Sequence, residues 1–160
     1  MLRVIIAIIL GVISLGCKEE DSLVSSNPDL YEVNFMTLDK FGQEERTYLQ
    51  GDEIVLLLSI KNTSNRETEL KFPSSCQINF KVLDEAGDEV QTAFSWQTCN
   101  WANTSFTLSP GETKNHQAVW NQKLYQDYLE TDSFISTGNY TIKAFNFGID
   151  LEAIREVIIE

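Results

Sequence analysis

Apolar residues recur at every second position along most of the chain after residue 28. Such alternation over four to eight residues is typical of a strand with one buried face. It predicts strands over residues 30–38, 67–72, 78–82, 114–120 and 140–144. Residues 54–60 (Ile-Val-Leu-Leu-Leu-Ser-Ile) form a dense apolar run instead, which predicts a central strand buried on both faces.

Turn-forming sequences separate these runs. Residues 84–88 (Asp-Glu-Ala-Gly-Asp) offer a glycine for a hairpin, from which residues 90–94 are predicted to return as a strand. Residues 109–112 (Ser-Pro-Gly-Glu) place proline and glycine where turns favour them. Eight or nine short strands with regular turns and no internal repeat predict an all-β fold, an antiparallel β-sandwich.

Two segments are ambiguous from their pattern. Gln122–Asp132 has room for a helical turn but carries no clear cap or apolar stripe. Leu151–Ile159 fits a helical spacing as well as a strand. A strand is favoured there, because β-branched residues dominate its end.

The first 16 residues have the layout of a secretory signal peptide: one charge at Arg3, an apolar run over 4–15, and small residues before Cys17. An apolar run of about 12 residues is shorter than the roughly 20 that a spanning helix needs. A retained transmembrane helix and a signal cut elsewhere are the alternatives. The small residue before the cysteine resembles the lipobox of bacterial lipoproteins, although Ser14 stands where leucine is commoner. The resemblance implies lipidation of Cys17 and a membrane anchor.

Polar residues 17–28 predict a flexible tether between this anchor and a single domain over residues 29–160. Lys18 followed by three acidic residues resembles the export signal of surface lipoproteins in one Gram-negative phylum, but a solvated spacer explains it equally well. The predicted location is therefore the cell envelope, on the outer membrane, with surface exposure as an open alternative.

Charge narrows the choice of partners. The formal net charge is −12, and an acidic surface repels nucleic acid phosphates, so no nucleic acid partner is expected. The dispersed charge favours a soluble monomer. The remaining cysteines, Cys76 and Cys99, are predicted to pair, since disulfides persist in exported proteins. Their bond would stabilise the fold by about 3 kcal/mol, and two separate thiols are the alternative.

No catalytic chemistry emerges from the residues. The single histidine, His116, falls in a predicted strand and is expected to be a surface or half-buried strand residue. No Gly-x-Ser-x-Gly elbow or phosphate-binding loop is present. Residues 84–89 are acidic but lack the spacing of a calcium loop. The sequence therefore predicts no enzyme, no catalytic residue, no metal site and no cofactor.

Residues 51–147 resemble the BsuPI-type intracellular proteinase inhibitor domain. The residues that carry the resemblance are 61–65 (Lys-Asn-Thr-Ser-Asn); Leu70, Phe72, Pro73 and Ser74; Gln77, Phe80, Val82, Asp84, Gly87, Glu89 and Val90; Leu108, Pro110, Gly111 and Glu112; and Trp120, Gly138, Tyr140 and Thr141. The resemblance implies an immunoglobulin-like sandwich and a proteinase-binding role. Cys76 stands where the family usually has a small residue, and a signal peptide departs from "intracellular".

The most unusual segment is 94–103, which holds two of the three tryptophans. Phe94, Trp96 and Trp101 are the candidate binding residues, since tryptophan is enriched at binding hot spots and a disulfide would pre-organise the segment. The structural interpretation has Trp96 and Trp101 folding over the sandwich end against the disulfide. Trp120 is predicted to be core, and Tyr125 and Tyr128 form a fainter second surface.

The sequence thus predicts a lipid-anchored, non-catalytic binding domain. If it inhibits a proteinase, its reactive loop is expected within Ser95–Asn103. The alternative is an envelope scaffold or assembly lipoprotein that binds a protein partner without inhibiting proteinases. An exposed edge strand such as Val157–Glu160 would then pair with a strand of that partner.

Overall fold

The computed structural model describes residues 23–25, 30–90, 99–126, 129–146 and 151–160, which form strands and no helix. The strands are β1 Leu23–Ser25, β2 Tyr31–Leu38, β3 Thr47–Tyr48, β4 Ile54–Asn62, β5 Thr68–Phe72, β6 Asn79–Leu83, β7 Glu89–Val90, β8 Thr104–Leu108, β9 Thr113–Trp120, β10 Lys123–Gln126, β11 Leu129–Phe134, β12 Gly138–Asn146 and β13 Leu151–Ile159. The predicted all-β class is confirmed.

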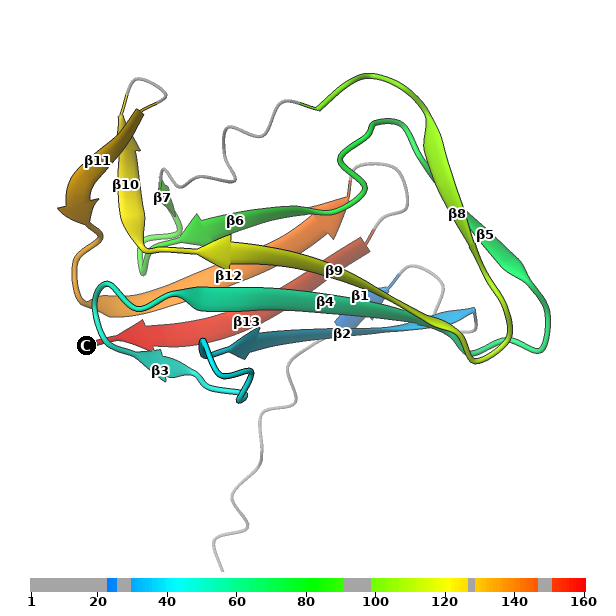
Figure 1. The fold of residues 1–160 in the computed structure, drawn as a ribbon, viewed down its shortest axis with the longest axis horizontal. Coiled ribbons are helices and arrows are strands. Elements are labelled where there is room, and N and C mark those ends of the chain that lie inside the picture. The colour runs from blue at the N-terminus through cyan, green and yellow to red at the C-terminus, as the bar shows by residue number, and fades with distance from the viewer. Residues whose placement is uncertain (1–22, 26–29, 91–98, 127–128, 147–150) are drawn as a thin grey trace, which may run out of the picture.

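Two sheets pack face to face as an antiparallel, immunoglobulin-like β-sandwich (Figure 1). The front sheet has the strand order β2-β4-β9, and the back sheet has the order β1-β13-β12-β6-β7. The short β3 adds to β13 in parallel, the one parallel pair among the described strands. Two-stranded ribbons, β5-β8 and β10-β11, extend from opposite ends of the front sheet (Figure 1).

The core lies between the two sheets and follows the period-two pattern. Alternate residues of β4, from Ile54 to Ile60, have no exposed surface. Trp120 is likewise fully buried, as predicted, and its ring meets that of Tyr140 edge-on at 6.1 Å between centroids. Trp120 therefore bridges the front and back sheets at the end of β9.

The prediction that residues 54–60 are buried on both faces is wrong. β4 is indeed central, between β2 and β9, but its burial alternates, with Val55 and Leu57 only half-buried. In a three-stranded sheet with one partner sheet, only one face of the central strand meets the core. The outer face of this strand therefore keeps apolar side chains in partial contact with water.

Four further predictions are tested by the strand boundaries. Leu151–Ile159 is strand β13, as favoured, but residues 123–134 form the β10-β11 hairpin instead of a helical turn. Val157–Glu160 is not an open edge, because Ile158 and Ile159 pair with β3 and the Glu160 N–H donates to the Tyr48 carbonyl at 2.9 Å. Residues 23–25, predicted as tether, form β1 against β13.

The strand predicted over residues 90–94 overlaps β7 at Val90. Its remaining residues, 91–94, lie outside the described part of the chain.

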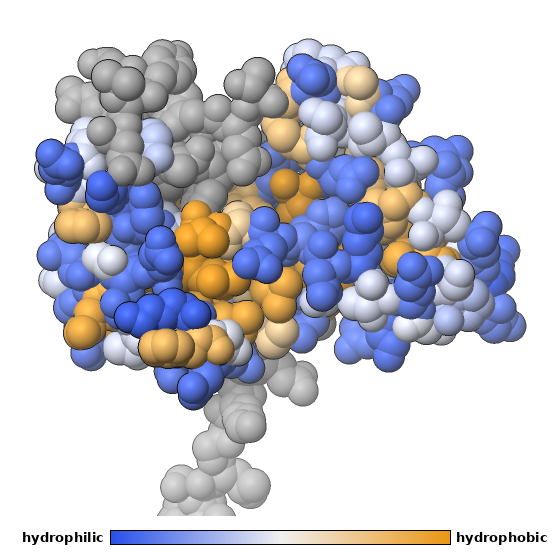
Figure 2. All heavy atoms as spheres, in the orientation of Figure 1, coloured by the Kyte–Doolittle hydropathy of each residue, from blue (hydrophilic) through white to orange (hydrophobic). Residues whose placement is uncertain are grey.

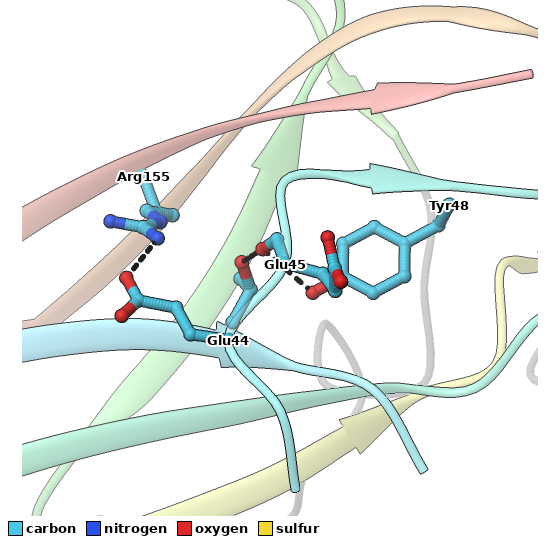
Figure 3. Close-up of polar contacts among 5 residues, drawn as sticks. Glu44, Glu45, Tyr48 and Arg155 are labelled. Carbon is cyan, nitrogen blue, oxygen red and sulfur yellow. Dashed lines mark hydrogen bonds and ion pairs between the residues drawn. The ribbon is translucent and has the colours of Figure 1, made fainter. Parts of the chain in front are cut away.

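The loop between β2 and β3 carries Glu44 and Glu45, which contact Arg155 and Tyr48 respectively (Figure 3). Arg155 of β13 points between the sheets, with 5% of its side chain exposed, and pairs with Glu44 of this loop. The carbonyl of Glu45 accepts hydrogen bonds from Thr37 Oγ1 at 2.6 Å and from the Tyr48 hydroxyl at 2.9 Å. Burial raises the pKa of Tyr48, which keeps the hydroxyl protonated as a donor. No described residue belongs to a helix long and apolar enough to cross a membrane.

Candidate functional site

The candidate site is the segment 99–103, which precedes β8 and has no regular secondary structure. As the sequence predicts, a disulfide joins Cys99 to Cys76, with their Cα atoms 5.3 Å apart. The neighbouring residues are linked as well. The Ser75 N–H donates to the Asn100 carbonyl at 2.9 Å, and the Asn100 N–H donates to Ser75 Oγ at 2.9 Å. Both backbone polar groups of Asn100 are therefore fixed to the β5–β6 connection.

A second set of contacts fixes the other end of the segment. Thr104 Oγ1 donates to the Ser74 carbonyl at 2.8 Å, and Gln77 Nε2 donates to Thr104 Oγ1 at 3.3 Å. Thr104 also begins β8, where it pairs with Phe72 of β5. Residues 101–103 thus span two anchored points, which removes much of the conformational entropy that a flexible loop loses on binding.

Trp101 projects from this fixed segment with 92% of its surface exposed. The interpretation that Trp101 packs over the sandwich end against the disulfide is therefore wrong. Phe94 and Trp96, the other two candidates, lie outside the described residues, as does Tyr128. Tyr125 is half-buried in β10 and far along the chain from Trp101.

A shallow hollow of about 470 Å³ lies beside the segment, lined by residues that include Asn103, Thr104, Phe72 and Pro73. Glu69 and Lys71 lie on its rim as an exposed ion pair with a 3.2 Å N–O distance. A hydrogen bond from Ser105, followed by the contact with Lys71, lowers the pKa of Glu69. The hollow thus combines the apolar side chains of Phe72 and Pro73 with polar and charged neighbours, close in sequence to Trp101.

His116, on β9, is half-buried as predicted. Its ring lies 5.7 Å from that of Phe106, and its Nε2 has no hydrogen-bond partner among the described residues. Burial, and then the neighbouring charge of Lys114, lowers the pKa of His116. The described residues also hold no cluster of three or more side chains suited to a metal ion.

The lowered pKa of His116 predicts a pH dependence of stability. The unfolded chain binds a proton near pH 6.5 and the folded chain binds it only at lower pH, so the free energy of unfolding should fall as the pH drops below about 6.5. Urea unfolding at pH 7.5 and pH 5 measures the fall. A His116→Gln variant should lose the part of this decrease in the free energy of unfolding that protonation of His116 causes. If the variant has the same pH profile as the native chain, His116 is not the group responsible.

A second candidate surface is the outer face of the front sheet. Leu38, Val55 and Val119 lie in one row across β2, β4 and β9, with Val119 46% exposed, and Met36 and Leu57 lie in the next row. Figure 2 shows apolar side chains gathered over this end of the sheet. The signal for this face was that odd as well as even positions of residues 54–60 are apolar, a pattern that predicted burial on both sides of the strand.

The back sheet carries a groove of about 610 Å³, where Glu85, Asn139 and Glu156 are among the lining residues. Asn139 Nδ2 donates to Glu85 Oε1 at 2.7 Å, which ties the β6–β7 turn to β12. The lining of the groove also includes Tyr140 and Thr141 of β12.

Comparisons with solved structures find distant likenesses. A β-glucosidase from Listeria innocua in complex with glucose has a TM-score of 0.46 and 14% identity, covering 81% of this chain and 16% of that one. The alkylpurine DNA glycosylase AlkC of Pseudomonas fluorescens, bound to DNA with an abasic site analogue, has a TM-score of 0.45 and 11% identity, covering 81% and 30%. A CARDB domain from Pyrococcus furiosus in complex with di-metal ions has a TM-score of 0.39 and 13% identity, covering 82% and 90%.

A search of curated proteins found no match. The sequence profile of the BsuPI intracellular proteinase inhibitors matches residues 41–150. This match spans β3 to β12, including the disulfide and the segment 99–103. The chain belongs to the BsuPI intracellular proteinase inhibitor family.

Proposed function

We propose that this chain is a lipid-anchored, non-catalytic binding domain that inhibits a proteinase through the segment 99–103. The observation that carries the proposal is the exposed Trp101 on a backbone fixed at both ends by the disulfide and by hydrogen bonds. Membership of a proteinase inhibitor family supports the target class. The absence of a catalytic arrangement around His116, among the described residues, supports a binding role.

The rigidity of the segment 99–103 favours inhibition. A proteinase cleft binds extended chain, and a ligand that is already rigid loses little entropy on entering it. Tryptophan adds a large, apolar contact area with few rotatable bonds. A segment fixed on both sides of Trp101 also resists the distortion that cleavage requires, so it occupies the cleft longer than a flexible substrate.

The test of inhibition is a titration of subtilisin and chymotrypsin with the full chain, purified in detergent micelles. We expect residual activity of at least one proteinase to fall linearly to an endpoint near one inhibitor per enzyme, and the Trp101→Ala variant to lose this inhibition. If inhibition persists in the variant, the chain is still a proteinase inhibitor, but its binding loop lies outside the segment 99–103. No inhibition of either proteinase would contradict the proposed function.

The anchor is the second part of the proposal. Cys17 follows a small residue at the end of an apolar run, as in a lipobox. Expression in a bacterium should yield a chain that begins at Cys17, carries a diacylglyceryl mass and partitions into detergent. A Cys17→Ser variant should stay uncleaved at this site and lack the added mass. Mass spectrometry that finds an unmodified Cys17 in the processed chain would contradict lipid anchoring.

A different function, capture of a protein partner at the envelope, is favoured by the apolar outer face of the front sheet. Val119 is 46% exposed there beside Val55 and Leu38. Asp39 and Glu53 flank the same rows in sequence, so the matching partner has an apolar centre and a basic rim. This function predicts that Val119→Glu abolishes partner binding while Trp101→Ala leaves it intact.

A further inference from the structure

We infer that Trp101 enters the primary specificity pocket of the target proteinase, which makes the target an endopeptidase that cleaves after large aromatic residues. The inference rests on the proposed function and adds to it a specificity-determining residue and a target class. It concerns the pocket that this one side chain enters, whereas the proposed function concerns inhibition through the segment 99–103.

The exposure of Trp101 is the first argument. With 92% of its surface exposed, the indole contacts almost nothing in its own domain, whereas Trp120 is fully buried. The adjacent residues Asn100 and Ala102 are short and exposed, so they leave the indole clear of neighbours. Among serine proteinases, chymotrypsin-like enzymes have a hydrophobic slot for this side chain, while trypsin has a carboxylate and elastase a small pocket.

The backbone on either side of Trp101 is the second argument. Asn100 is fixed by both of its backbone hydrogen bonds to Ser75, and Thr104 is fixed by Ser74 and by β5. The Trp101–Ala102 bond therefore lies between two anchored residues, as a scissile bond does in an inhibitor that binds like a substrate. In Figure 1 this segment leads into β8 at the top of the molecule, away from the front-sheet face.

The same anchors explain why cleavage would not release the target. Hydrolysis adds one water across the Trp101–Ala102 bond and leaves a carboxylate on Trp101 and an amine on Ala102. The carboxylate end stays attached to the disulfide through Asn100 and Cys99. The amine end stays attached through Thr104 to the β5-β8 pair. Both new ends remain in the cleft, so the cleaved chain continues to inhibit.

The experiment measures inhibition constants of the full chain in detergent against chymotrypsin, trypsin and elastase. The variants are Trp101→Ala, Trp101→Phe and Trp101→Lys, with Phe41→Ala as the matched control, since Phe41 is 75% exposed in the β2–β3 connection. Melting temperatures verify that all variants fold. Mass spectrometry after long incubation with chymotrypsin locates any cleaved bond.

We expect the chain to inhibit chymotrypsin and Trp101→Ala to weaken this inhibition by about 30-fold or more. Trp101→Phe and Phe41→Ala should retain it, Trp101→Lys should transfer it to trypsin, and slow cleavage should fall between Trp101 and Ala102. A Trp101→Lys variant that gains no trypsin inhibition overturns the inference and leaves the proposed function standing. Inhibition that is indifferent to residue 101 overturns the inference and the assignment of the segment 99–103, and leaves only proteinase inhibition standing. No inhibition of any of the three enzymes overturns both.

Discussion

Replacement of Asn62 by alanine should lower the free energy of unfolding by about 3 kcal/mol. Asn62 ends β4 with no exposed surface. Its Nδ2 donates to the carbonyls of Arg66 at 2.8 Å and Leu108 at 2.9 Å, and its Oδ1 accepts the Ser64 N–H at 2.9 Å. One side chain thus holds the turn after β4 to the end of β8, and its removal leaves buried polar groups without these partners.

Urea unfolding of the two variants Asn62→Ala and Asn65→Ala measures this effect. Asn65 lies three residues on, in the same turn, and is exposed, so its replacement should change the free energy by less than about 0.5 kcal/mol. Asn62→Asp is a sharper probe, because it keeps the shape and the acceptor but places a carboxylate oxygen against the two carbonyls. An Asn62→Asp protein as stable as the native one would contradict the role of the donated hydrogen bonds.

Loss of the disulfide is the other large expected effect. The bond closes a loop between residues 23 positions apart, and a Cys76→Ser, Cys99→Ser double variant should lose about 3 kcal/mol of stability. The local effect should be greater still, because the bond fixes the segment that carries Trp101. Hydrogen exchange should show the amides of Ser75 and Asn100 losing protection beyond the global change.

The native chain under reducing conditions is the matched comparison, since it should lose the same stability without any substitution. The Cys17→Ser variant, which keeps the disulfide, should retain the native urea midpoint. If the double variant has the native midpoint and the Asn100 amide remains protected, then the hydrogen bonds to Ser75 and Thr104 hold the segment by themselves. In that case the disulfide has no role in pre-organising it.

Local pattern was enough to predict the strands because the period of two directly reports which side chains meet a core. β2, β5, β6, β9 and β12 were placed this way, and the buried Trp120 with them. The pattern failed for residues 123–134, where a hairpin forms without a clear alternation. The pattern also missed the role of Gln122, which is buried and adopts a φ of +59°. Its side-chain amide accepts a hydrogen bond from the Gly51 N–H and donates to the carbonyls of Leu49 and Asp52.

The candidate site was likewise predicted from the sequence in part. Sequence alone identified Cys76, Cys99 and Trp101, because residue type and compartment favour a disulfide and because tryptophan outside a strand is conspicuous. It did not decide whether Trp101 packs inward or projects, since that depends on Ser74 and Ser75. These residues belong to the β5–β6 connection and form hydrogen bonds with Thr104 and Asn100. It also did not reveal the Arg155–Glu44 pair, whose partners are 111 residues apart.

The sequence by itself determined the all-β class, the positions of most strands, the pairing of the two cysteines and the family of the domain. These properties follow from residue type and short-range periodicity, which act locally along the chain. Only the tertiary structure decided which faces of the strands meet water, as at Val55 and Leu57, and which edges are covered, as β3 covers the end of β13. Burial and edge pairing depend on how many sheets stack and which distant segments return to them, and no local pattern encodes that number.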